Sequence, residues 1–126
     1  MPLTHITLRT GKTEAYRQAI FDSLHQAMHT CFDVPADNQF ATMTECDATH
    51  FRYSASYLGV ERSDDLVIIQ ITANNTRSVA QKKALYRQIV ERLGHSPGIR
   101  PADVFINLVE VDRANWSLGP GEAQYA

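Results

Sequence analysis

Residues 66–72 read Leu66-Val67-Ile68-Ile69-Gln70-Ile71-Thr72, a run with apolar or β-branched side chains on both parities. Such a strand is typical of the interior of a sheet, because both of its faces are covered. Ser78 and Gln81 follow with the spacing of a capping box, which predicts a helix from Ser78 to Gly94. After a turn at 97–101, residues 104–111 are strongly apolar again. The stretch 66–111 therefore predicts one β-α-β unit, whose two strands pair in parallel.

The first half of the chain has the same order of elements. Apolar and polar residues alternate along 3–9, which predicts a strand. Apolar residues recur every three or four positions along 13–31, which indicates an amphipathic helix ended by Pro35. A second strand is predicted at 40–45, followed by an irregular segment at 50–65 that turns at Gly59. When the halves are superimposed, the helical positions match and Pro35-Ala36-Asp37 falls close to Pro101-Ala102-Asp103. We interpret the chain as a tandem repeat.

The repeat predicts an α/β fold in a single domain, 1–126, with units at approximately 2–60 and 61–126. Two β-α-β units give a four-stranded mixed sheet with both helices on one face. The opposite face is then expected to be apolar and uncovered. An uncovered apolar face needs a partner, so we expect an oligomer.

Composition narrows the classes of function. The 126 residues are 44% apolar and carry a formal net charge of -2, which gives no reason to expect nucleic acid or an anionic membrane as a partner. No apolar run reaches the roughly 20 residues that a bilayer requires, and the beginning of the chain lacks the features of a signal peptide. We therefore expect a cytoplasmic protein. Cys31 and Cys46 are expected to be reduced, and His25 with His29 lacks a third metal ligand, so no metal site is predicted.

Pro2 stands directly after Met1, at the head of the first strand. If Met1 is removed, Pro2 becomes a secondary amine at the chain terminus, and burial or a nearby cation would lower its pKa toward neutrality. Such an amine can act as a general base or acid. If Met1 is retained, the Pro2 nitrogen is an amide and has no such role.

Three features of the chain can be taken together: the Pro2 start, the two β-α-β units and the tail Asn115-Trp116-Ser117-Leu118-Gly119-Pro120-Gly121-Glu122-Ala123-Gln124-Tyr125. Together they resemble the tautomerase superfamily, and within it the malonate semialdehyde decarboxylase-like group. The resemblance covers essentially the whole chain. It implies a homotrimer, no metal or organic cofactor, and an amino-terminal proline as the catalytic group.

The resemblance also assigns site residues. Pro2 matches the catalytic proline, Arg77 the second of two arginines that hold a substrate carboxylate, and Trp116 the tryptophan of the pocket. The first arginine falls on Asn74 or Asn75, the aromatic residue after the Trp-Ser pair is Leu118, and the aspartate of the decarboxylase aligns with Asn38, one position after Asp37. Asn38, Asn75, Trp116 and Leu118 are thus predicted to bind substrate.

We expect a cofactor-independent tautomerase that interconverts the keto and enol forms of a small 2-oxo acid, with Pro2 as base and Arg77 holding the carboxylate. Two alternatives stay open. One is a decarboxylase or hydratase of the malonate semialdehyde type, in which protonated Pro2 acts as an acid. The other is a trimeric binding protein without enzymatic activity, which a retained Met1 would favour.

Overall fold

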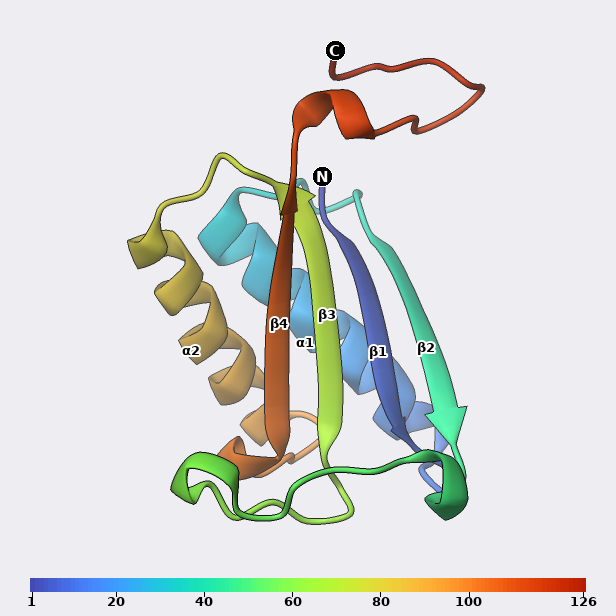
Figure 1. The fold of residues 1–126 in the computed structure, drawn as a ribbon, viewed down its shortest axis with the longest axis vertical. Helices are drawn as coiled ribbons and strands as arrows, with labels where there is room; N and C mark the ends of the chain where they lie inside the picture. Colours follow the sequence, from blue (N-terminus) through green and yellow to red (C-terminus); the bar gives the residue numbers. More distant parts are fainter.

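A computed structural model describes all residues, 1–126, and contains two β-α-β units side by side (Figure 1). The regular elements, in chain order, are β1 (Leu3–Arg9), α1 (Glu14–Phe32), β2 (Phe40–Cys46), β3 (Val67–Asn74), α2 (Val79–His95) and β4 (Val104–Val111). The sheet order is β2-β1-β3-β4. Pairing is parallel within each unit, β1 with β2 and β3 with β4, and antiparallel between β1 and β3. The predicted four-stranded mixed sheet is therefore confirmed.

Local capping residues set the helix ends. The Thr13 hydroxyl accepts a hydrogen bond from the Tyr16 amide at the start of α1, and Ser78 and Gln81 form the predicted capping box at the start of α2. Helix α1 ends at Phe32, because Asp33 adopts the left-handed conformation (φ 55°, ψ 31°). The chain thus leaves the helix before Pro35, the residue expected to end it. Between β2 and β3, the segment 47–66 contains only two single 3₁₀ turns.

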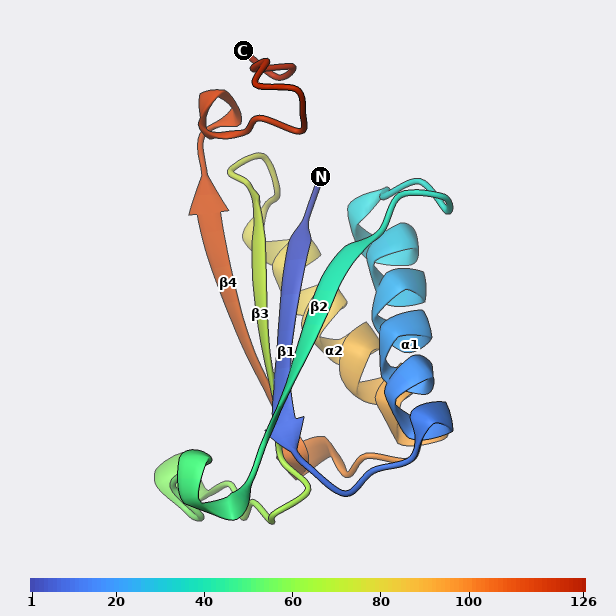
Figure 2. The ribbon, with the colours of Figure 1, turned by 90° about the vertical axis from the view of Figure 1, so that its right-hand side faces the viewer.

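The core lies between the two helices and one face of the sheet (Figure 2). Fully buried side chains come from both sides of this layer: Ile6, Ile69, Ile71, Leu85, Ile89 and Leu93. Each such side chain contributes about 1.5–3 kcal/mol through burial, so the two units stabilise each other across one continuous core. Neither helix has the length and apolar character that a bilayer-spanning segment requires.

The uncovered face of the sheet differs from the expected apolar surface. A polar row crosses all four strands in register, with Thr42 beside His5, His5 beside Gln70, and Gln70 beside Asn107. The His5 Nδ1 atom lies 2.6 Å from the Thr42 hydroxyl, and the Gln70 amide donates to the Asn107 side chain at 3.0 Å. Exposed apolar side chains lie on either side of this row: Leu3, Phe40, Val109 and Phe105. The expectation of an apolar face was therefore wrong, because each strand directs one of these polar side chains outward and the register aligns them in a row.

Candidate active site

The predicted site residues gather at one end of the sheet. Because β1 and β3 are antiparallel, the beginning of β1 lies beside the end of β3, at the same end of the sheet as the end of β4. The end of α1, the beginning of α2 and the carboxy-terminal tail reach the same end, which is the upper one in Figure 1. The amino terminus from the first unit and Arg77 from the second are thus brought together by the antiparallel contact between the units.

Arg77 lies in the loop between β3 and α2, with its side chain half-buried. One guanidinium nitrogen, Nη2, donates to the carbonyl oxygen of Phe32 at 2.9 Å, and the guanidinium carbon lies 4.7 Å from the centre of the Phe32 ring. Arg77 forms no salt bridge, so its charge is not neutralised by a carboxylate. These contacts fix the guanidinium and leave its charge available to an anion.

Arg77 lines an open hollow of about 410 Å³, which we name the cationic hollow. Its walls are Met1, Phe32, Asp33, Asn74, Thr76, Arg77, Gln81 and Arg113. Burial, and secondly the positive charge of Arg77, lower the pKa of the Met1 amino group below its ordinary value. The amino terminus therefore lies where the neutral form of an amine is favoured relative to an exposed terminus.

A second hollow of about 340 Å³, the apolar hollow, also has Met1 in its wall. Its walls are Met1, Pro2, Leu3, Phe40, Asn115, Trp116, Ser117 and Leu118. Pro2 itself is buried. The structure thus brings three predicted residues together here, Pro2, Trp116 and Leu118. Met1 is the one residue that lines both hollows.

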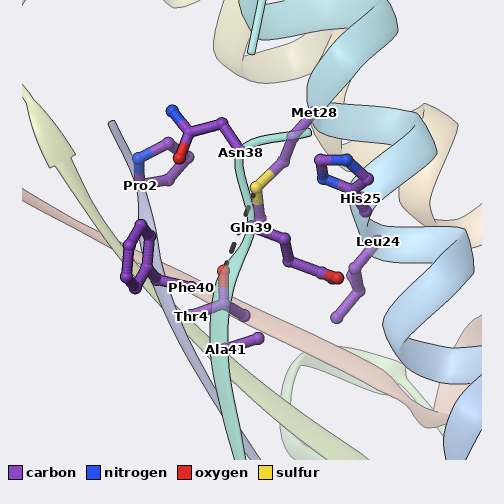
Figure 3. A pocket seen from close by; sticks show the side chains of 9 residues that line it. All are labelled: Pro2, Thr4, Leu24, His25, Met28, Asn38, Gln39, Phe40 and Ala41. Carbon is purple, nitrogen blue, oxygen red and sulfur yellow. Dashed lines mark hydrogen bonds between the residues drawn. The ribbon is translucent and has the colours of Figure 1, made fainter. Parts of the chain in front are cut away.

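Asn38 adjoins Pro2 in a narrow crevice with room for about one water molecule, ≈ 10 Å³ (Figure 3). The Asn38 side chain lies beside the Pro2 ring, between the end of α1 and the beginning of β2. The preceding residue, Asp37, is exposed and lines neither hollow nor this crevice. An amide, not a carboxylate, therefore stands next to Pro2.

The two asparagines at the end of β3 make structural contacts. Asn75 lines neither hollow, and its amide donates to the Asp112 carboxylate at 2.7 Å. Asn74 accepts a hydrogen bond from the Trp116 indole nitrogen at 2.7 Å and lines the cationic hollow. The structure therefore places Asn75, predicted to bind substrate, against the segment that follows β4.

Sequence reasoning did not select Arg113 or Gln81 as wall residues of the cationic hollow. Gln81 was recognised only as a capping residue. Arg113 precedes the tail motif and carries no pattern of its own, so no local signal identifies it. Only the path of the chain after β4 brings it to this end of the sheet.

The histidine pair on α1 has a structural explanation. His25 Nε2 lies 2.6 Å from the Ala36 carbonyl oxygen, and His29 Nδ1 lies 2.7 Å from that of Val34. Both rings thus hold the loop that leads from α1 to the crevice. No group of three potential metal ligands is present, and Cys31 and Cys46 are free thiols.

Comparison with known proteins identifies relatives along the whole chain. A family model described as a tautomerase enzyme matches residues 38–119. The chain is 40% identical over 124 residues to "Probable tautomerase YusQ" of Bacillus subtilis (strain 168), covering 98% of each protein. It is 32% identical over 125 residues to "Probable tautomerase YrdN" of the same organism, covering 99% of this chain and 96% of that protein.

Solved structures agree with these relatives. A crystal structure of malonate semialdehyde decarboxylase superimposes with a TM-score of 0.91 at 32% identity, covering 98% of this chain and 95% of that one. A fused 4-OT, solved as a symmetric trimer, superimposes with a TM-score of 0.80 at 20% identity, covering 98% of this chain and 97% of that one. The second likeness shows the fold alone.

Proposed function

This chain belongs to the tautomerase superfamily and to its malonate semialdehyde decarboxylase-like group, and from that premise we propose that it is a cofactor-independent tautomerase of a small 2-oxo acid. In this proposal Met1 is removed, the Pro2 amine is the general base, and Arg77 binds the substrate carboxylate.

One observation carries the proposal: Met1 is the one residue that lines both the cationic hollow and the apolar hollow. Removing Met1 would join the two and leave the Pro2 nitrogen between them. A 2-oxo acid with an apolar remainder has the matching shape, because its carboxylate fits beside Arg77 and its apolar part fits against Phe40, Trp116 and Leu118. The carbon next to the carbonyl group would then lie near the amine.

The electrostatics favour a base at this place. The pKa of the Met1 amine is lowered by burial and by Arg77, and both causes would act on a Pro2 amine one residue further in. A neutral Pro2 nitrogen removes the proton from C3 of the keto acid, and the electron pair of the C–H bond moves through C2 onto the carbonyl oxygen. The protonated amine then returns the proton to that oxygen, giving the enol. The guanidinium of Arg77 stabilises the negative charge as it develops.

We also propose that the active form is a homotrimer. A solved relative of the same fold is described as a symmetric trimer, and this chain leaves one sheet face uncovered with Phe40 and Phe105 about half exposed. A second copy of the chain would remove these side chains from water.

A decarboxylase or hydratase of the malonate semialdehyde type is the second candidate, favoured by the likeness to malonate semialdehyde decarboxylase. Asn38 argues against it, because an amide beside Pro2 cannot stabilise a protonated amine as a carboxylate would. If Met1 is retained, the Pro2 nitrogen is an amide, and a trimeric binding protein without activity becomes the remaining candidate.

The test begins with the intact mass of the protein, which tells whether Met1 is present. Phenylpyruvate enol and malonate semialdehyde are then assayed from pH 5 to 9 with the protein and with Pro2→Ala. The rate of a tautomerase on the enol rises with pH as Pro2 loses its proton. A decarboxylase instead loses activity on the semialdehyde as the pH rises. Equal turnover by Pro2→Ala, or an intact mass that includes methionine in an active sample, would overturn the proline mechanism.

A further inference from the structure

We propose that Arg113 is a second carboxylate-binding residue of this site, and that Asn74 and Asn75 are the residues that position it. The inference rests on the proposed function, since it concerns the same substrate. In it, Arg77 and Arg113 together hold the carboxylate and the adjacent 2-oxo oxygen of the acid.

The location of Arg113 is the first observation. Arg113 begins the 3₁₀ turn Arg113–Asn115 directly after β4, and it lines the cationic hollow together with Arg77. The two arginines approach from different elements, Arg77 from the loop before α2 and Arg113 from the end of β4. Two guanidinium groups in one hollow can each donate paired hydrogen bonds to the oxygens of a planar acid.

The charge balance of the hollow is the second observation. Arg113 forms no salt bridge, as Arg77 forms none, although other arginines of the chain do, such as Arg9 with Asp64 at 2.7 Å. Asp33 is the only acidic residue among the walls of the hollow. Two unpaired cations in one recess repel each other, and a bound anion removes that cost. The recess therefore favours a carboxylate ligand.

The third observation is that Arg113 is held from both sides. Before it, the Asp112 carboxylate accepts a hydrogen bond from Asn75, whose backbone amide also donates to the Val111 carbonyl oxygen at 3.1 Å. After it, the indole nitrogen of Trp116 donates to Asn74 at 2.7 Å. These three hydrogen bonds attach the turn to the end of β3, so the two asparagines act on substrate through Arg113 and Trp116.

The tail completes the support. The guanidinium carbon of Arg113 lies 5.8 Å from the centre of the Tyr125 ring, within the range of a cation–π contact. The Gln124 side chain accepts a hydrogen bond from the Leu118 amide at 2.9 Å and donates to the Gly119 carbonyl oxygen, which folds the tail back on itself. The folded tail thereby brings Tyr125 to the exposed side chain of Arg113.

The experiment compares Arg113→Ala and Arg113→Lys with Arg87→Ala, a control that removes an exposed arginine of α2 with no salt bridge. With phenylpyruvate enol, we expect Arg113→Ala to raise KM by roughly 10- to 100-fold while kcat changes only a few-fold, because a charge-assisted hydrogen bond is lost in the ground state and transition state alike. Arg113→Lys should recover part of the loss, and Arg87→Ala should leave both parameters unchanged. An unchanged KM in Arg113→Ala would overturn the inference.

Binding without turnover separates this inference from the proposed function. In the Pro2→Ala background, the binding of benzoate is measured by calorimetric titration. Arg113→Ala should weaken benzoate binding by the same factor by which it raises KM, whereas the neutral ligand benzyl alcohol should bind as before. Equal weakening of both ligands would mean that the variant only loosens the tail, which overturns the inference. If benzoate binding depends on Arg113 but no variant or parent protein turns over enol substrates, the proposed function fails and the inference stands.

A double-mutant cycle tests the positioning role of Asn75. Asn75→Ala should raise KM by several-fold in the parent protein, because Arg113 loses its support. In the Arg113→Ala background the same change should have almost no further effect. Independent effects of the two substitutions would overturn the assignment of Asn75 as a positioning residue.

Discussion

Replacement of Asp103 by alanine should destabilise the fold strongly, although Asp37 of the same tripeptide, Pro-Ala-Asp, should be replaceable at little cost. Asp103 is fully buried at the end of the sheet opposite the candidate site, where β4 begins. Its carboxylate accepts hydrogen bonds from the Ser63 amide at 2.7 Å and the Ser63 hydroxyl at 2.6 Å, and a longer one from Arg100 at 3.4 Å. Asp37 is exposed.

The expected loss in the free energy of unfolding follows from these contacts. A hydrogen bond to a charged group contributes about 1.5–3 kcal/mol, and a partner left unsatisfied in a buried place costs about 1–3 kcal/mol more. Asp103→Ala removes two short hydrogen bonds and leaves the two Ser63 donors without their acceptor. Because the Ser63 side is only partly buried and water can reach it, we expect a loss of about 3–4 kcal/mol rather than the full sum. Asp37→Ala should change the free energy of unfolding by less than about 0.5 kcal/mol.

Urea denaturation followed by circular dichroism, at one fixed protein concentration, measures the free energy of unfolding of both variants. Their midpoints are compared on condition that this free energy falls with urea at the same slope. A loss below about 1 kcal/mol for Asp103→Ala would refute the reasoning, since the energy was assigned to charged, buried hydrogen bonds. Asp37→Ala also has a functional readout: it should keep the parent rate on every substrate. A large loss of rate would place Asp37, and not Asn38, beside the Pro2 amine.

Two further predictions concern the site. Arg77→Gln removes the positive charge that helps to lower the pKa of the terminal amine, so the acidic limb of the pH profile of kcat/KM should move to higher pH. A limb that stays in place or moves to lower pH would contradict this. Trp116→Phe removes the hydrogen bond to Asn74 but keeps an aromatic ring in the apolar hollow, so it should cost about 1 kcal/mol of stability and raise KM several-fold. Urea denaturation and steady-state kinetics measure these two effects, and an unchanged KM would show that the tail needs no such support.

The elements were predictable because their signals are local. Three patterns each lie within one turn or one strand: the alternation along 3–9, the apolar run at 66–72 and the capping box at Ser78 and Gln81. The structure has a strand or helix at each place. Pro2, Arg77, Trp116 and Leu118 were predicted by resemblance, and the structure places all four around the two hollows that meet at Met1. Their roles in catalysis stay predictions.

What escaped prediction depends on contacts between distant residues. The polar row through His5 and Gln70 exists only because the strands pair in one particular register. Arg113 reaches the cationic hollow because Asn75 and Trp116 attach the end of β4 to the end of β3. The asparagines at 74 and 75 were considered as substitutes for a substrate-binding arginine, whereas their contacts explain them as supports of the turn. No pattern along the chain distinguishes these two roles.

The two ends of the sheet differ in the surroundings of one basic residue, although the two units are similar. Lys12 follows β1 in the loop before α1, as Arg77 follows β3 in the loop before α2. Lys12 forms a salt bridge with Asp65 at 2.6 Å, and this contact raises the pKa of the lysine. Arg77 forms no salt bridge, and it lines the cationic hollow together with the amino-terminal residue Met1. The cation at the Lys12 end is therefore neutralised by a carboxylate, whereas Arg77 keeps its charge and lowers the pKa of the Met1 amine.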